Sequence, residues 1–105
     1  MNQNDLLELH KTLCDKGREL MQRKNADYAN GPDPFHNFRM SKLLHIPEAK
    51  GVLLRMQDKM ARMVSLIDRG DLKVKDESMT DTIIDLINYS VILHGLLKEG
   101  EHEPV

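Results

Sequence analysis

The sequence has few aromatic residues, one cysteine and no long apolar run. It has no Trp, two Tyr and two Phe, so its seven Met and its Leu and Ile must fill the core. That composition favours helix packing over a β-sandwich. A single cysteine excludes an internal disulfide framework and fits a reducing cytoplasm. No apolar stretch approaches the ~18 residues of a membrane span, and we see no secretion signal, so we expect a cytoplasmic protein without a membrane partner.

The length and charge of the chain limit its size class and its partners. Its 105 residues suffice for one domain, which we take as 1–105. Charged residues make up 30% of the chain and hydrophobic residues 40%, as in folded globular proteins. The formal net charge of −2 gives no direct signal for nucleic-acid binding.

Apolar residues at helical spacing predict three long helices and one short one. We expect the long helices over about 5–25, 47–69 and 78–98, the first capped by Asn4 or Asp5. The short helix is expected over 35–39, with Asp33 as its cap. A loop at about 26–34 and a frayed tail at about 99–105 complete the chain. The predicted fold is therefore all-α, a small helical bundle.

Three features predict how these helices pack. Gly17 lies inside the first helix and marks the close approach of another helix. The third predicted helix carries one continuous apolar stripe, expected to face the core: Ala49, Leu53, Met56, Met60, Met63, Val64 and Ile67. The last helix is apolar almost all round, which needs more cover than two neighbouring helices give, so we expect a homodimer or a larger assembly.

The last helix nevertheless carries a polar seam, Glu77, Asp81, Asp85 and Asn88, at helical spacing. Acids buried there must be paired, protonated or bound to metal. The preceding helix has a second polar stripe at the same spacing, and two helices joined by a short link are antiparallel neighbours, so the two seams can meet. That stripe is Arg55, Asp58, Lys59 and Arg62.

Two readings of these seams remain open at this point. One is an interhelical salt-bridge ladder, the commoner role of charged stripes. The other is a Mg²⁺ site, in which carboxylates hold the metal and the basic side chains hold phosphates. The irregular segment favours the second reading, because it gathers groups that can stack on a base or bond to its edge: Lys24, Asp27, Tyr28, Phe35, His36, Asn37, Phe38 and Arg39. For the two Phe alone, a core role is the more frequent one.

Taken together, the motifs resemble the nucleotide modification associated domain family, first type, which occurs in bacteriophages and bacteria. The resemblance covers about residues 24–93 and rests on KNADYANG, FHNF, GVLLRMQDKMARMVSL and DESMTDTIIDLINYSVIL. It implies a link to phage nucleotide metabolism and DNA modification, and hence a host-cytoplasm location if a phage encodes the chain.

More loosely, the acidic helix is similar to that of the all-α NTP pyrophosphohydrolases, the MazG and dimeric dUTPase group. Those enzymes are helical oligomers that use Mg²⁺ to cleave between the α and β phosphates, with ExxE on one helix and ExxD on the next. The resemblance places the second acidic set on Glu77, Asp81 and Asp85, here spaced four and four. For the first set only Asp58 is present, which implies a single Mg²⁺ or basic residues in place of a metal.

These observations predict a nucleotide-handling protein. The leading reading is a Mg²⁺-dependent nucleoside triphosphate pyrophosphohydrolase, with Asp81 and Asp85 catalytic and Asp58, Glu77, Asp81 and Asp85 holding the metal. The alternative is a binder or sponge that sequesters a nucleotide, including a cyclic one, without altering it. A third reading is a structural bundle that binds a partner. The predicted substrate-binding residues are Lys24, Asp27, Tyr28, His36, Asn37, Phe38, Arg39, Arg55, Lys59, Arg62 and Asn88.

Overall fold

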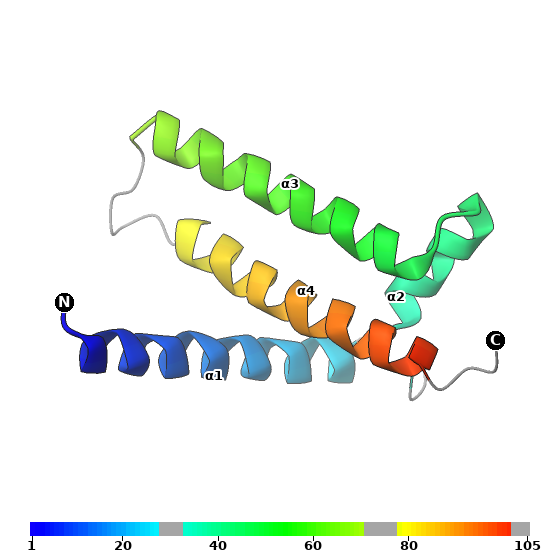
Figure 1. Cartoon of the computed structure of the whole chain (residues 1–105), viewed down its shortest axis with the longest axis horizontal. Coiled ribbons are helices and arrows are strands. Elements are labelled where there is room, and N and C mark those ends of the chain that lie inside the picture. The colour runs from blue at the N-terminus through cyan, green and yellow to red at the C-terminus, as the bar shows by residue number, and fades with distance from the viewer. Residues whose placement is uncertain (28–32, 71–77, 102–105) are drawn as a thin grey trace.

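The computed structural model of the chain describes residues 1–27, 33–70 and 78–101, and the side chains of 25–27, 78 and 101 lie outside that description. Every regular element in these ranges is helical (Figure 1). The elements are α1 (Gln3–Asp27), α2 (His36–Arg39), the 3₁₀ helix η1 (Met40–Leu44), α3 (Glu48–Asp68) and α4 (Ser78–Glu101). The expected all-α fold, with three long helices and one short one, is confirmed.

The first helix begins earlier than predicted, because its cap is Asn2 rather than Asn4 or Asp5. The Asn2 Oδ1 atom accepts a hydrogen bond of 2.8 Å from the Asp5 backbone N–H. In return, the Asn2 N–H donates to Asp5 Oδ2 at 3.1 Å. This reciprocal pair satisfies two groups that would otherwise lack partners at the helix start, and it makes Asp5 the third residue of the helix.

A glycine marks the end of α3, as predicted, but not the end of α4. Gly70 ends α3 as predicted, with a φ of +68° and a backbone hydrogen bond of 3.0 Å to the Ile67 carbonyl. The predicted end of α4 before Gly100 is wrong, because the helix continues through Gly100 to Glu101. A glycine costs a helix only about 1 kcal/mol, which one more turn of backbone hydrogen bonds can offset.

The central helix of the fold is α4, which packs against α3 on one side and against α1 on the other (Figure 1). α3 and α4 run antiparallel, as predicted for helices joined by a short link. Over the parts of the chain that the structure describes, α1 and α3 do not pack against each other. One side of α4 between them therefore stays open.

The core is centred where α2 meets α3 and α4. Phe38, Val52 and Leu96 are buried together there, one from each helix. Phe35, Met56, Tyr89, Ile92 and Leu93 pack around them. The core role that we considered more frequent for the two Phe is confirmed for Phe38.

The predicted core stripe of α3 is wrong in its orientation. The buried residues of α3 are Val52 and Leu66, and Lys59, Met56 and Met63 are half-buried beside them. Four members of the predicted stripe have at least half of their surface exposed: Leu53, Met60, Val64 and Ile67. The apolar sector of α3 is wider than its contact with α4, so the sequence pattern could not show which part of it is covered.

Gly17 marks a close helix contact, as predicted. It is buried against α4, and its carbonyl accepts a hydrogen bond of 3.0 Å from Asn88 Nδ2. A Cβ atom at position 17 would lie 2.7 Å from Asn88 Oδ1 and 3.6 Å from Ile84 Cγ2. Only glycine lets α1 approach α4 this closely while Asn88 keeps its position.

Within the described residues, no helix combines the length and the apolar character required to cross a membrane.

Candidate functional site

The open side of α4 holds a cavity of about 310 Å³, referred to below as the central cavity. Residues from α1, the segment before α2, α2 itself, α3 and α4 line it. Its wall consists of Met21, Lys24, Pro34, His36, Asn37, Phe38, Met40, Arg55, Asp85, Asn88, Tyr89 and Ile92. Its volume is that of small-molecule sites, and apolar and polar side chains contribute to its wall in similar number.

Two hollows adjoin the central cavity. The α1-side hollow is lined by Lys16, Glu19, Leu20, Arg23, Lys24, Thr80, Asp81, Ile84 and Asp85. The α3-side hollow is lined by Arg55, Asp58, Lys59, Arg62 and Tyr89. Lys24 and Asp85 border both the cavity and the α1-side hollow, and Arg55 and Tyr89 border both the cavity and the α3-side hollow. The three spaces are therefore neighbours along α4, and we refer to them together as the groove.

The structure brings together around the central cavity seven of the residues that we predicted from sequence to form a site. They come from four separate stretches of the chain: Lys24, His36, Asn37, Phe38, Arg55, Asp85 and Asn88. Asp81 lies on the α1-side hollow, and Asp58, Lys59 and Arg62 lie on the α3-side hollow. Arg39 lines none of the three spaces.

The two predicted seams meet at one ion pair. Lys59 Nζ lies 3.0 Å from Asp85 Oδ2, and both side chains are mostly buried. Lysine thus neutralises the acid that faces the cavity, as buried charges require. Asn88, one turn further along α4, is held by Gly17 of α1. The polar seam is therefore fixed from both neighbouring helices.

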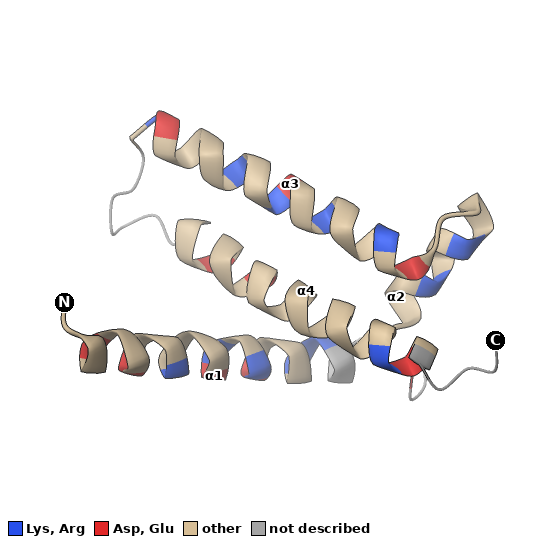
Figure 2. Cartoon of the chain, viewed as in Figure 1, with Lys and Arg blue, Asp and Glu red and all other residues tan. Residues whose placement is uncertain are grey.

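The other cations of α3 remain available to a ligand. Figure 2 shows Lys and Arg at intervals along α3. Arg55 and Arg62 form no ion pair within the described part of the chain. The Arg55 guanidinium lies over the Phe38 ring, 5.7 Å from its centroid. Contact with an aromatic face orients an arginine and leaves the N–H donors at the edge of its guanidinium group free to bind an anion.

An aromatic pair forms part of the cavity wall. The Phe38 and Tyr89 rings meet edge to face, with centroids 6.2 Å apart and planes at 87°. Phe38 is buried, whereas Tyr89 is half-buried and borders two of the three spaces. Our sequence reasoning missed Tyr89, although it follows Asp85 by four residues and so falls on the polar seam.

Other lining residues were also missed. Met21, Pro34, Met40 and Ile92 are apolar wall residues, for which the sequence carries no functional signal. Lys16 and Arg23 of α1 line the α1-side hollow, and their separation of seven residues places them on one helix face. That spacing was visible in the sequence.

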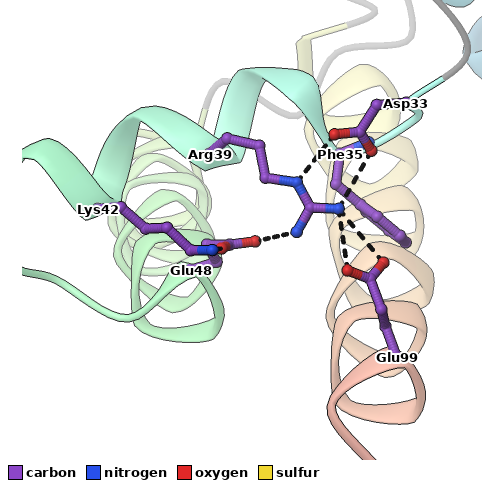
Figure 3. A network of polar contacts seen from close by, with 6 residues as sticks. All are labelled: Asp33, Phe35, Arg39, Lys42, Glu48 and Glu99. Carbon is purple, nitrogen blue, oxygen red and sulfur yellow. Dashed lines mark hydrogen bonds and ion pairs between the residues drawn. The ribbon is translucent and has the colours of Figure 1, made fainter. Parts of the chain in front are cut away.

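Arg39 occupies a different site, where it joins the loop before α2 to α3 and α4 (Figure 3). Its guanidinium bonds to Asp33 Oδ2 at 2.9 Å, to Glu99 Oε1 at 3.0 Å, and to Glu48. It also lies over the Phe35 ring, 5.3 Å from the centroid. Three carboxylates from three parts of the chain thus surround one cation, as in a structural cross-link.

The charges of this cluster shift the pKa values of its members. The hydrogen bond from Arg39 and a second one from the Phe35 backbone N–H lower the pKa of Asp33. Burial acts to raise the pKa of Glu48, but the hydrogen bonds from Lys42 and Arg39 outweigh burial and lower it. The hydrogen bond to Asp33 raises the pKa of Arg39, against the effect of burial. All three groups are therefore charged at neutral pH.

Three predicted site residues lie outside what the structure describes. Glu77 and Tyr28 fall in the ranges 71–77 and 28–32, and Asp27 is the last residue of α1, without a described side chain. Within the described residues, no group of three or more His, Cys, Asp or Glu side chains is placed to hold a metal ion. Asp58 borders a different hollow from Asp81 and Asp85, so these three predicted ligands do not line one common space.

Comparison with protein-family models, with curated proteins and with solved structures found no match to this chain.

Proposed function

We propose that the protein binds a nucleotide in the groove over α4. The observation that carries the proposal is the convergence of Lys24, Arg55 and the aromatic wall on one cavity of about 310 Å³. A cation pair beside an aromatic face suits a ligand that has both phosphates and a base. The resemblance of the sequence motifs to the nucleotide modification associated domain family points to the same ligand class.

In this proposal, the phosphates lie along the basic flank of α3. Arg55 contributes a planar guanidinium, held in place by Phe38, and Arg62 contributes a second one in the adjoining hollow. Lys24 approaches from α1 on the opposite side of the cavity. Guanidinium groups bind phosphate oxygens through two parallel hydrogen bonds, which favours them for this role.

The base packs against Tyr89, and its edge meets polar groups from two elements. His36 and Asn37 of α2 and Asn88 of α4 line the same cavity and supply hydrogen-bond donors and acceptors. Asn88 already donates one hydrogen bond to Gly17, so its oxygen stays available as an acceptor. This division of roles leaves the α1-side hollow for further phosphates or for solvent.

Mg²⁺-dependent hydrolysis is the second candidate. It is favoured by Asp81 and Asp85, one helical turn apart on the α1-side hollow, beside Lys24. Bound Mg²⁺ would neutralise phosphate charge and lower the pKa of a coordinated water. Of the described carboxylates in the groove, Asp85 is already paired with Lys59, and no group of three ligands is present. The described geometry therefore supports binding better than a metal-dependent reaction.

The test is incubation of the pure protein with dNTPs, NTPs and cyclic dinucleotides, in Mg²⁺ and in EDTA, followed by mass spectrometry and calorimetry. A nucleotide that binds in EDTA and is recovered intact supports the binder. Pyrophosphate and a monophosphate formed only with Mg²⁺ support the hydrolase. If no nucleotide is bound or altered, the ion pair between α3 and α4 is a structural contact and the proposal fails.

The matched variants are Arg55→Gln in the cavity and Lys50→Gln on the exposed face of α3, away from the groove. Both remove one positive charge from the same helix. A loss of affinity in Arg55→Gln alone ties binding to the groove, whereas an equal loss in both variants would indicate only attraction to net charge.

We further propose that the chain acts as a homo-oligomer in the cytoplasm. The single Cys14 fits a reducing compartment. The many exposed apolar side chains of one chain fit a larger assembly.

A further inference from the structure

The side of the α3–α4 pair that faces away from the groove is mainly apolar. On α3 it exposes four large side chains, each with 50–58% of its surface accessible: Leu53, Met60, Val64 and Ile67. On α4 it includes Ile83, which is half-buried, and Leu97, which is 53% exposed. These six residues define what we call the back face.

Helix geometry places the back-face residues of α3 and α4 on the same side. At ~100° per residue, Val64 lies about 180° around α3 from Arg55, and Ile83 lies about 160° around α4 from Asp85. Arg55 and Asp85 line the same cavity, so they mark one side of the helix pair. The back-face residues of both helices therefore share the opposite side, and they form one surface.

This surface has the composition of an interface core. No Lys, Arg, Asp or Glu occurs on the back-face positions of α3 between Leu53 and Ile67, or of α4 between Ile83 and Leu97. The helix positions between the six residues also include the polar side chains of Gln57 on α3 and of Ser90 and His94 on α4. Interface cores are depleted in charge in the same way, whereas ordinary solvent-facing helix surfaces carry charges. On the groove side, the same two helices do carry charged residues, such as Arg55 and Asp85.

The accessible surface of the chain is large enough for a second copy to cover part of it. The chain exposes 8404 Å², whereas a compact monomer of 12.1 kDa is expected to expose roughly 6,000 Å². Its radius of gyration of 15.9 Å is also larger than the roughly 13 Å expected for this length. A standard dimer buries about 800 Å² on each partner, which the excess can supply.

We propose that the back face is the docking surface for a second copy of this chain. A twofold axis through it brings the same uncharged residues of both copies together, since a symmetric interface must be self-complementary. A face without Lys, Arg, Asp or Glu meets that condition without repulsion between those charges. Docking on this side leaves the groove of each copy open to solvent. The inference therefore stands independently of the ligand proposed for the groove.

The test is the mass of the protein in solution by light scattering and sedimentation from 1 to 100 μM. The wild type is expected to have about twice the mass of one chain, and Val64→Glu is expected to weaken association at least tenfold. The control is Leu43→Glu, an exposed residue of η1 outside the back face, which should keep the wild-type mass. A wild type that is monomeric at 100 μM would overturn the proposal.

A second variant guards against a Val64→Glu protein that fails to fold. Gln57 is already exposed on α3, so Gln57→Glu leaves the packing of one chain intact but places a charge in the docked face. It should also weaken association while keeping the helix content measured by circular dichroism. If Gln57→Glu and Val64→Glu both associate as tightly as Leu43→Glu, the copies meet through another surface and the assignment is wrong.

Discussion

Lys59 of α3 and Asp85 of α4 form an ion pair of 3.0 Å at the floor of the groove, where the two polar seams of the sequence meet. The pair affects the charge of the groove, because it neutralises the acid that lines the central cavity together with Arg55 and Lys24. It also bears on the choice between nucleotide binding and Mg²⁺-dependent hydrolysis, since a metal ion bound to Asp85 would have to replace the lysine.

Removing the lysine should weaken the groove as an anion site. In Lys59→Gln, Asp85 is left without its cation beside the cavity, and it repels phosphates. The loss of one charged contact corresponds to about 1.5–3 kcal/mol, or roughly 10- to 100-fold in Kd. Calorimetry with the nucleotide retained by the wild type measures the change. Lys50→Gln, outside the groove on the same helix, should bind as the wild type does.

The reciprocal change, Asp85→Asn, distinguishes binding from catalysis. It removes a negative charge from the cavity, so a binder should keep its affinity or gain up to about tenfold, in EDTA as well as in Mg²⁺. A Mg²⁺-dependent hydrolase should instead lose turnover, because it has lost a metal ligand. Product formation and Kd are measured on the same samples, and lost affinity without any turnover in the wild type would contradict both readings.

The contact between Gly17 and Asn88 gives a stability prediction with an internal control. In Gly17→Ala, the new Cβ would lie 2.7 Å from Asn88 Oδ1, so the amide must move and the hydrogen bond to α1 is lost. The expected cost is about 1–3 kcal/mol, even though alanine favours a helix. Gly100→Ala places its Cβ within 4 Å of no atom and should stabilise the chain by up to about 1 kcal/mol. Urea denaturation of both variants measures the contrast.

These contacts also show what the sequence could predict. Residue spacing alone indicated that Asp81, Asp85 and Asn88 form one seam, that α3 and α4 are antiparallel, and that Gly17 touches a neighbouring helix. These depend on helix periodicity and short links, which are local properties. The orientation of α3 depends on which part of a wide apolar sector meets α4, and that is decided by tertiary packing. The ion pair between Arg39 and Glu99 joins residues 60 positions apart in the sequence, so no local pattern could predict it.

The Arg39 cluster should contribute to stability rather than to ligand binding. In Arg39→Gln, Asp33, Glu48 and Glu99 lose the cation that holds them near one another, and the carboxylates repel. We expect a loss of roughly 2 kcal/mol in the free energy of unfolding and no change in nucleotide affinity. Lys11→Gln, which breaks an exposed ion pair within α1, should leave the free energy of unfolding essentially unchanged. A large drop in affinity at constant stability would instead place Arg39 in the binding site.

The same cluster predicts how stability depends on pH. Asp33 and Glu48 have lower pKa values in the folded chain than in the unfolded chain. As the pH falls, the unfolded chain therefore takes up protons first, and acid favours unfolding. Their contribution is complete above the ordinary carboxyl pKa values near 4 and is lost as the pH falls through the lower, folded values.

Glu48→Gln isolates one part of this effect. Its amide is neutral at every pH, so the variant lacks the stabilising charge of residue 48 at pH 7 and loses no further contribution from that residue in acid. The difference in unfolding free energy between wild type and variant should be largest at pH 6–7 and shrink towards pH 3. Urea titrations at pH 7, 5 and 3 measure it. A difference that stays constant across this range would mean that Glu48 stabilises the fold through packing, because a contribution from its charge must vanish once the carboxyl group is protonated.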